Sequence, residues 1–353
     1  MTALPFDHPF LSGLLGDAEI SAQFSAKADI AAMVRFEITL ARGEADAGVI
    51  GADAADAIER GLADFKPDFA ALRDGVAQDG VVIPALVEAM RQAVGNPHGE
   101  KVHFGATSQD AIDTSLALRL GDVLGILEER LRGVVAMLQS LEAAQGGVEV
   151  MAHTRMQAAI PVTAARKIAS WRLPLERHLD RLETVRRDVL VLTFGGAAGT
   201  LEKLGDKGPA VRARMAAVLG LRDVEHPHHS ERDGQAALAN WLSLVTGSLG
   251  KMGQDIALMA QNEVGAVKLA SGGGSSAMPH KQNPVGAEVL VTLARFNATL
   301  LAGMHQSLVH ENERSGAAWT LEWMLLPQMA VATGVALRNT GALLDGLEFR
   351  PLD

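Results

Sequence analysis

The feature that most constrains this chain is a run of apolar residues that keeps helical spacing over many turns. From Ala111 to Ala143, apolar side chains recur every three or four residues, as they do along one face of an α-helix. At 1.5 Å per residue, such a helix would extend roughly 50 Å. A helix of this length needs partners of similar length to cover its apolar face.

Three further stretches repeat the pattern, and no strand-like alternation of comparable length is found. These stretches cover residues 162–192, 236–269 and 284–309. The sequence therefore predicts an all-α fold, in which long helices lie side by side as a bundle. Because the apolar faces are broader than one neighbouring helix would cover, we expect subunits to share the bundle; a monomeric helical domain is the alternative.

The distribution of glycine and proline predicts how the chain divides into domains. Up to about residue 100 the apolar stretches are shorter and are interrupted by both residue types, which predicts an N-terminal helical domain over 1–100. Residues 101–330 contain the long helices and form the central bundle domain. Residues 331–353 have room for about one more helix, a short C-terminal remnant.

The composition excludes several kinds of chemistry. The 353 residues include no cysteine and no tyrosine, so we expect no disulfide, no thiolate metal site and no phenolic acid or base. A formal net charge of −10 argues against a nucleic-acid partner, which needs a concentrated basic face. The N-terminus has no signal-peptide pattern, and no stretch has the roughly 18 uninterrupted apolar residues of a membrane span. We therefore expect a soluble, cytoplasmic protein.

A segment rich in glycine, GGGSSAMPHKQNP at residues 272–284, interrupts the helical pattern. Its three glycines make the backbone costly to order, so we expect residues 271–284 to form a mobile loop. The loop offers several hydrogen-bonding groups and one fixed positive charge, from Ser275, Ser276, His280, Lys281 and Asn283. Such a loop suits an anionic substrate that must be shielded from water, although a plain interhelical linker is the alternative.

The order of residues in this loop resembles the signature GSSxMPxKxNP of the fumarase/aspartase superfamily. The resemblance implies that Ser275 transfers a proton next to a substrate carboxylate, while Lys281 and Asn283 bind that carboxylate. It also places further loop residues against the substrate, namely Ser276, Met278 and His280. A serine hydroxyl is too weak a base unaided, so the site must supply positive charge and peptide N–H groups as well.

A second segment resembles the superfamily's TSxD anion-binding turn. It reads HFGATSQDAIDT from His103 to Thr114, just before the first long helix. N–H groups and hydroxyls at the start of a helix bind carboxylates, although Thr107 or Ser108 would also serve as an ordinary N-cap. The fuller string resembles that of the bacterial 3-carboxy-cis,cis-muconate cycloisomerases. This resemblance implies substrate contacts from His103, Thr107, Ser108 and Gln109.

A third segment departs from the superfamily's usual pattern. Residues 154–161 read TRMQAAIP where most of these lyases carry THxQxAxP, with Arg155 in place of the histidine that helps to protonate the leaving group. Arginine cannot act as an acid near neutral pH. A cycloisomerase does not need that acid, because its ring-forming group is a carboxylate with a pKa of about 4. We therefore expect Arg155 to clamp a substrate carboxylate, with Gln157 beside it.

His153, one position before Thr154, does not inherit the acid role. On a helix or a tight turn the His153 side chain would point about 100° away from that of the next residue, Thr154.

Two later segments match the same superfamily in part. The string HENERSGAAW from His310 to Trp319 resembles an EHER…W motif and makes Arg314 a candidate substrate ligand, although a lone arginine would more often lie in solvent. The cluster EHPHHSERD at 225–233 invites a metal interpretation but lacks a second ligand group with zinc-site spacing. It resembles the PWHxQRD segment of the family instead, with His229, Arg232 and Asp233 as loop and wall residues. We expect no metal and no cofactor.

Together these resemblances imply an enzyme that acts on a small tricarboxylate, with no nucleic-acid or membrane partner. The implied reaction converts 3-carboxy-cis,cis-muconate to 4-carboxymuconolactone, a step of protocatechuate breakdown. The implied assembly is a homotetramer whose active sites draw segments from different subunits. An adenylosuccinate-type lyase, which would need another acid, and a non-catalytic structural member of the fold are the alternatives. Relatives usually carry a third helical domain, which we expect to be nearly absent.

Overall fold

The computed structural model describes residues 4–270, 272–274, 276–278 and 281–352. Helices dominate these residues, which confirms the predicted all-α class. The long bundle consists of α7 (Ser108–Gln145), α8 (Ala164–Val189), α10 (Asp233–Met259), α11 (Val285–Gln306) and α12 (Gly316–Leu344). The other helices are α1 (Ser12–Leu15), α2 (Ala18–Gln23), α3 (Ala26–Asp46), α4 (Ala52–Leu62), α5 (Phe69–Asp79), α6 (Ile83–Val94), α9 (Gly208–Leu219) and the 3-10 turns η1 (His98–Lys101) and η2 (Gly205–Lys207). The strands are β1 (Glu149–Thr154), β2 (Gln157–Thr163), β3 (Val267–Lys268) and β4 (Glu348–Phe349).

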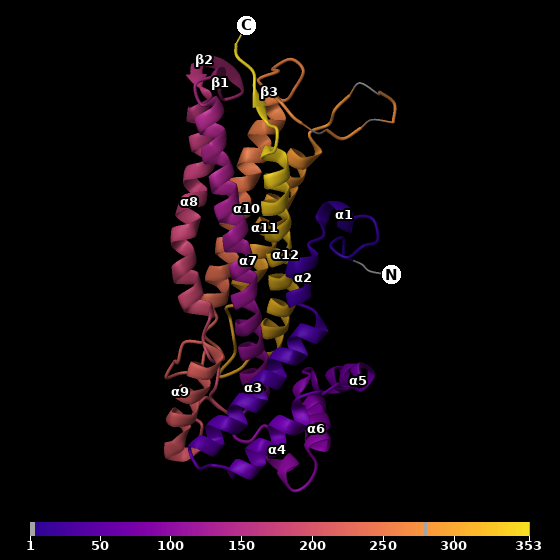
Figure 1. Ribbon diagram of the computed structural model, residues 1–353, viewed down its shortest axis with the longest axis vertical. Coiled ribbons are helices and arrows are strands. Elements are labelled where there is room, and N and C mark those ends of the chain that lie inside the picture. The colour runs from indigo at the N-terminus through magenta and orange to yellow at the C-terminus, as the bar shows by residue number, and fades with distance from the viewer. Residues whose placement is uncertain (1–3, 271, 275, 279–280, 353) are drawn as a thin grey trace.

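The bundle makes the molecule long and narrow. Figure 1 shows its five helices side by side along the long axis, with α3 to α6 and α9 gathered at the end where α7 begins. The opposite end carries the hairpin β1–β2 and the β3 strand. Since α7 has 38 residues, it spans roughly 57 Å. The two ends of the bundle are therefore separated by about that distance.

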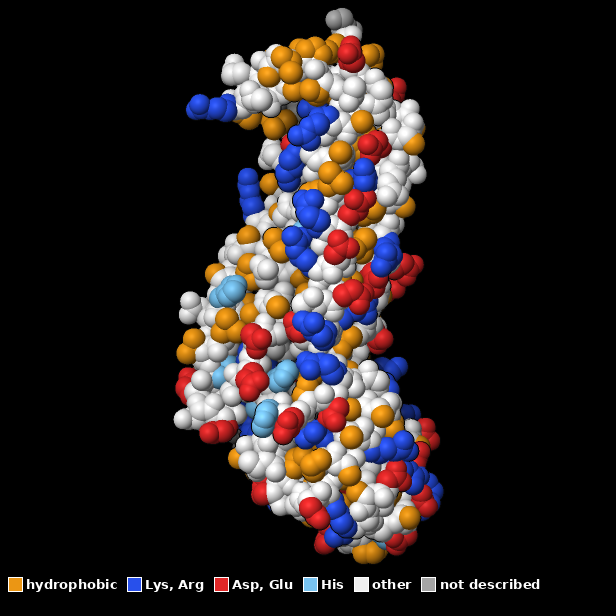
Figure 2. All heavy atoms as spheres, turned by 90° about the vertical axis from the view of Figure 1, so that its left-hand side faces the viewer, with side chains coloured by type: hydrophobic (Ala, Val, Ile, Leu, Met, Phe, Trp, Pro, Cys, Tyr) orange, Lys and Arg blue, Asp and Glu red, His pale blue; other side chains and the backbone are white. Residues whose placement is uncertain are grey.

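The faces of the bundle differ in polarity. Figure 2 shows Lys and Arg interspersed with Asp and Glu along the face that α8 forms, where Arg172 pairs with Glu142 and Glu176. Exposed pairs of this kind add little stability, but a charged face marks the side of a helix that meets water. In contrast, α11 is long and apolar enough to cross a membrane by length and composition, alone among the described helices, and only 28% of its most apolar window is buried. It packs against α10 and α12, and this packing leaves the apolar side chains of Val291, Phe296, Leu300 and Leu301 partly uncovered.

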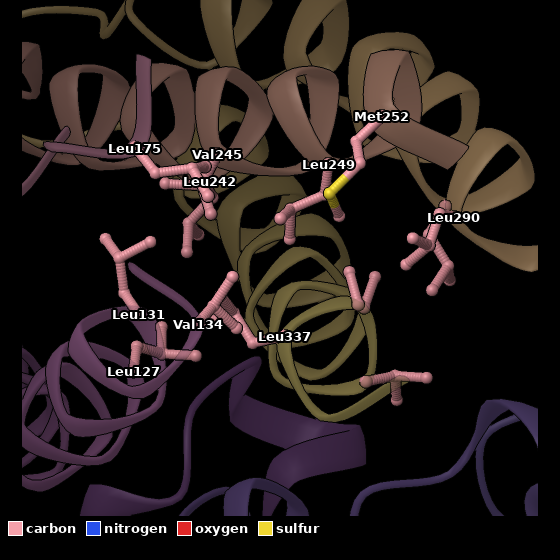
Figure 3. Packing of buried hydrophobic residues seen from close by; sticks show 14 of the residues in the cluster. Leu127, Leu131, Val134, Leu175, Leu242, Val245, Leu249, Met252, Leu290 and Leu337 are labelled. Atoms are coloured by element: carbon pink, nitrogen blue, oxygen red, sulfur yellow. The ribbon is translucent and has the colours of Figure 1, made fainter. Parts of the chain in front are cut away.

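Leucine and valine side chains from all five long helices interlock in the middle of the bundle. Figure 3 shows Leu127 and Leu131 of α7 facing Leu242 of α10 and Leu337 of α12. Each of these side chains is at most 1% exposed. Burying a leucine stabilises the fold by roughly 1.5–3 kcal/mol, so this core holds the long helices together along the bundle.

A second apolar core lies at the end where α7 begins. It contains Phe36 of α3, Ile58 of α4 and Leu86 of α6, together with Met215 of α9 from much later in the chain. The helices before residue 100 therefore share their core with α9. The division into domains stays a prediction, although its boundary at residue 330 falls inside α12, whose residues up to Leu344 continue along the bundle.

Residues 149–163 form an antiparallel hairpin, so of the two conformations considered around residue 155, a helix or a tight turn, the structure has the tight turn. Thr154 pairs with Gln157, so Arg155 and Met156 form the two-residue turn, with φ of 48° and 67°. Positive φ at both positions is what a type I′ turn requires, and Asn-Gly is the usual sequence for it. Arg-Met carries no such signal, so the sequence did not reveal the hairpin. The following helix begins at Ala164 instead of residue 162, and α10 ends at Met259, well before residue 269.

Candidate active site

One group of predicted site residues lies together where α7 begins. It comprises His103, Thr107, Ser108, Gln109 and Arg314. Thr107 is the N-cap of α7, and its backbone N–H donates to Asp110 Oδ2 at 3.0 Å, which confirms the N-cap prediction. The first turn of a long helix also presents unpaired N–H groups and the positive end of the helix dipole. The turn is therefore suited to hold a carboxylate, as the sequence predicts.

Gln109 is fully buried and its amide is engaged by the protein. Its Nε2 donates to Asp113 Oδ2 at 3.1 Å and to the carbonyl oxygen of His229 at 2.7 Å. Its Oε1 accepts from Arg314 Nε at 2.9 Å. The two donor bonds fix the amide so that its oxygen faces the guanidinium. This geometry makes Gln109 a support for Arg314, whereas direct contact of Gln109 with substrate stays a prediction.

Replacing Gln109 with leucine is expected to destabilise the protein by about 1–3 kcal/mol, because two buried acceptors lose their donor. Urea denaturation at pH 7 measures this loss. Gln92→Leu is the matched control: Gln92 is exposed and its amide donates to Glu88 at the protein surface, so its replacement should change stability by less than about 0.5 kcal/mol. Equal effects of the two substitutions would show that the Gln109 amide has no structural role.

A buried charge network holds the start of α7 in place. Asp110 accepts from His229 Nε2 at 2.7 Å, and Asp113 accepts from Arg232 Nη1 at 2.7 Å. Arg232 also forms a fork with Glu322, with N–O distances of 2.9 and 2.6 Å. Burial alone would lower the pKa of Arg232, but the two carboxylates raise it above its usual value. Burial alone would raise the pKa of Glu322, but its hydrogen bonds lower it below its usual value. Arg232 and Glu322 are thus both charged at neutral pH.

Two histidines of segment 225–233 contact this network, His229 through its side chain and His228 through its backbone carbonyl oxygen. His229 is buried against Asp110, and among the described residues no three His, Asp or Glu side chains are arranged to hold a metal ion. The metal interpretation of this segment therefore gains no support.

Two buried glutamates of α3 lie behind His103. Glu37 Oε1 is 2.6 Å from His103 Nδ1, whereas both carboxylate oxygens of Glu44 lack a hydrogen-bond partner among the described residues. Burial and the charge of Glu37 raise the pKa of Glu44 from 4.5 to about 8, although Lys101 acts in the opposite direction. Glu44 is therefore protonated at neutral pH.

Glu44 makes the stability of the protein depend on pH. Between pH 4.5 and about 8 the folded state keeps a proton on Glu44 that the unfolded chain has released, so stability falls as pH rises through this window. Glu44→Gln removes this pH-dependent loss of stability, because glutamine has no proton to release. We therefore expect the variant to be more stable than the parent at pH 8 by on the order of 3 kcal/mol. Urea denaturation at pH 5.5 and pH 8 measures the difference. Glu88→Gln, at an exposed position, should follow the parent at both values; a parallel response of Glu44→Gln would contradict the assignment.

The remaining predicted site residues that the structure describes lie at the opposite end of the bundle (Figure 1). Arg155 and Gln157 are exposed at the tip of the hairpin. The base of the signature loop is closed by backbone bonds between Gly273 and Asn283 of 2.8 and 2.9 Å, and Ser276 is exposed. Ser275 and His280 lie outside the described residues, so their contacts, and the mobility expected for the loop, stay predictions.

Two cavities open at this end and share Gln261 in their walls. One of about 640 Å³ is lined by Met278, Lys281 and Asn283 of the loop. The other, of about 380 Å³, is lined by His153, Arg155 and Lys167, and burial lowers the pKa of that lysine while Asp255 partly offsets the effect. The hairpin and the signature loop therefore face neighbouring spaces with several positive groups.

Sequence reasoning missed two cationic residues of the larger cavity. Lys268 and Arg350 line it together with Lys281, opposed by one acidic residue, Glu263. Pairing of β3 with β4 brings Arg350 there, since Lys268 lies opposite Glu348. No local pattern could reveal a contact between segments so far apart in the chain.

The two groups cannot meet on one substrate within one chain. They lie at opposite ends of α7, which spans roughly 57 Å. Each end therefore carries only part of the predicted machinery.

Comparison with known proteins identifies the family. The family model described as Lyase matches residues 17–297. The chain belongs to this lyase family. It is 40% identical over 337 residues to a 3-carboxy-cis,cis-muconate cycloisomerase of Pseudomonas aeruginosa, covering 94% of this chain and 73% of that one. These matches confirm the predicted membership of the superfamily.

Solved structures of the lyase family agree with the fold. The 3-carboxy-cis,cis-muconate lactonizing enzyme of Pseudomonas putida is 37% identical, with a TM-score of 0.90 over 97% of this chain and 77% of that one. A fumarate lyase of Mesorhizobium sp. BNC1 is 35% identical, with a TM-score of 0.88 over 94% of this chain and 76% of that one.

Proposed function

We propose that this member of the lyase family converts 3-carboxy-cis,cis-muconate to 4-carboxymuconolactone. The observation that carries the proposal is Arg155, which occupies the exposed tip of a hairpin and lines a cavity with Lys167. A permanently charged group at this position suits a reaction in which the ring-forming carboxylate needs no acid. The similarity to the Pseudomonas cycloisomerase and lactonizing enzyme supports the same reaction.

The reaction is an isomerisation whose atoms balance without a further reactant. One substrate carboxylate oxygen forms a C–O bond to the conjugated double bond, and the π electrons move toward the carbon next to a second carboxylate. The resulting aci-carboxylate is stabilised by Lys281 and Asn283. Ser275 then delivers a proton to that carbon, and its own proton is restored from solvent.

The substrate's other charges are bound by groups from both ends of the bundle. Arg155 forms a two-pronged contact with one carboxylate, and Gln157 lies beside it. The start of α7, through Thr107 and Ser108, binds another with Arg314. Positive groups gathered in clefts of an acidic protein focus the field on an anion.

A homotetramer would bring these separated groups together. The distance between the two ends of α7 means that the α7 turn must come from a different subunit than the hairpin and the signature loop at the other end. The uncovered apolar surface of α11 is suited to pack against other copies of the chain. A soluble assembly of this kind, built without cysteine, fits the cytoplasm.

An ultraviolet assay tests the proposal, because lactonisation destroys the conjugated diene. Purified protein is incubated in parallel with 3-carboxy-cis,cis-muconate and with adenylosuccinate. We expect loss of the diene absorbance with the first substrate and no fumarate from the second. Turnover of neither would favour the non-catalytic alternative.

A fumarate-forming lyase is the second candidate, and the similarity to the Mesorhizobium fumarate lyase favours it. Such an enzyme would need an acid other than Arg155 to protonate its leaving group. Release of fumarate from adenylosuccinate, with muconate left intact, would establish this candidate and displace the first.

A further inference from the structure

The turn that carries His103 is held in an unfavourable backbone conformation. His103 has φ of 62° and Gly105 has φ of 73°, a region that glycine adopts readily and that other residues, histidine included, adopt only uncommonly. Positions of this kind persist only where the surroundings hold them, and they concentrate at functional sites. In this turn the holding contact is Glu37, whose carboxylate lies 2.6 Å from the imidazole.

Glu37 contacts one nitrogen of His103. The carboxylate is 1% exposed and sits beside Nδ1, so Nδ1 carries a proton and donates it to Glu37. The second nitrogen, Nε2, is the imidazole's other donor whenever the ring is charged. The imidazole itself is 12% exposed, at the edge of the turn that begins α7.

The groups around His103 determine whether the imidazole is charged. Burial alone would lower its pKa, but the charge and hydrogen bond of Glu37, with the charge of Asp110, raise it above its usual value of 6.5, and Arg91 opposes them. Behind Glu37, Glu44 is protonated and adds no second negative charge, while Lys101 is the nearby cation that lowers the pKa of Glu44. Among these neighbours, Glu37 alone both contacts the ring and carries the opposite charge.

We infer that Glu37 is a positioning residue of the active site. It orients His103 and keeps it as an imidazolium, so that the Nε2–H of His103 donates to a carboxylate of the substrate bound at the start of α7. This assignment rests on the proposed function, because it takes the substrate to be a polyanion. A second cation next to Thr107 and Ser108 then serves the turn that already offers backbone N–H groups.

Substitutions at Glu37 and Glu44 separate this role from simple packing. Glu37→Gln keeps the shape but removes the charge, so the pKa of His103 should fall below that of the parent. The His103 signal in carbon-13-labelled histidine NMR, identified with a His103→Gln variant, reports this pKa directly. Glu44→Gln mimics the neutral acid already present, so the NMR titration of His103 and the kinetic constants should stay within about twofold of the parent.

Steady-state kinetics with 3-carboxy-cis,cis-muconate give the second readout. At pH 7, Glu37→Gln should raise KM by about tenfold or more, the value of a charge-assisted hydrogen bond, with a smaller change in kcat. The KM of the parent should rise as pH passes the pKa of His103, and in Glu37→Gln this rise should occur at lower pH. Glu37→Asp, which keeps the charge, should restore part of the binding and also tests whether the site tolerates substitution.

Two results would overturn the inference: an unchanged His103 pKa in Glu37→Gln, or a lowered pKa with an unchanged KM. If the parent protein does not lactonise muconate, the proposed function fails, and the NMR titration still decides whether Glu37 sets the charge of His103.

Discussion

Ser275→Ala is expected to lower kcat for lactonisation by about a thousandfold, because it removes the group that transfers the only proton that moves. The KM for muconate should change by less than about threefold, since the charges of Lys281 and Arg155 and the amide of Asn283 still bind the substrate. The loss of diene absorbance under steady-state conditions measures both constants. A kcat effect without a KM effect is the pattern of a group that acts in the transition state.

Ser276→Ala is the matched control for this prediction. It removes a neighbouring hydroxyl from the same loop, and we expect it to cost less than about tenfold in kcat, as for the loss of one hydrogen bond to substrate. If Ser275→Ala turned over muconate at the parental rate, proton transfer would have to be assigned to another group. In heavy water the parent should also place deuterium on the carbon that Ser275 protonates, and Ser275→Ala should do so at its own reduced rate.

The long helices could be predicted from the sequence because their periodicity is produced by burial. The helix expected over residues 111–143 is α7, Ser108–Gln145, and the apolar positions that defined it are those of the core. The N-cap at Thr107 could be predicted equally well, since it depends on residues next to one another in the chain. Helix ends were less accurate, since the stretch expected to reach residue 269 ends as α10 at Met259.

The hairpin and the supports of the site could not be predicted in the same way. Arg155 and Met156 adopt positive φ without the residues that usually signal it, so the strands around them make the turn possible. Glu37 and His103 are 66 residues apart and meet only because α3 packs against α7. Local patterns identify residues able to do chemistry, whereas tertiary packing decides which of them are oriented and charged.

The length of the bundle keeps Arg155 and Arg314 of one chain far apart. One chain holds Arg155 at one end and Arg314 at the other, roughly 57 Å apart along α7. A substrate as small as a tricarboxylate touches both only if they come from different subunits. Arg155→Gln and Arg314→Gln should therefore each lower kcat/KM by about a hundredfold or more, as each removes a charged contact.

Mixing these two inactive variants is expected to restore activity. In a one-to-one mixture that has exchanged subunits, a site receives an intact Arg155 with a probability of one half and an intact Arg314 with a probability of one half, so about a quarter of the sites are complete. The rate at which the mixture lactonises muconate, measured after dilution from urea and reassembly, should approach that fraction of the parent's rate. If each chain formed its own site, the mixture would stay as inactive as its components.

The control for this mixture uses two residues of the same hairpin. Gln157→Ala mixed with Arg155→Gln should show no gain over the average of the separate proteins, because every hairpin in the mixture carries one of the two substitutions. Arg155→Lys refines the assignment further: a lysine keeps the charge but loses the planar fork, so it should recover only part of the activity. Full recovery would mean that the charge alone matters, and the two-pronged contact with the substrate carboxylate would then be wrong.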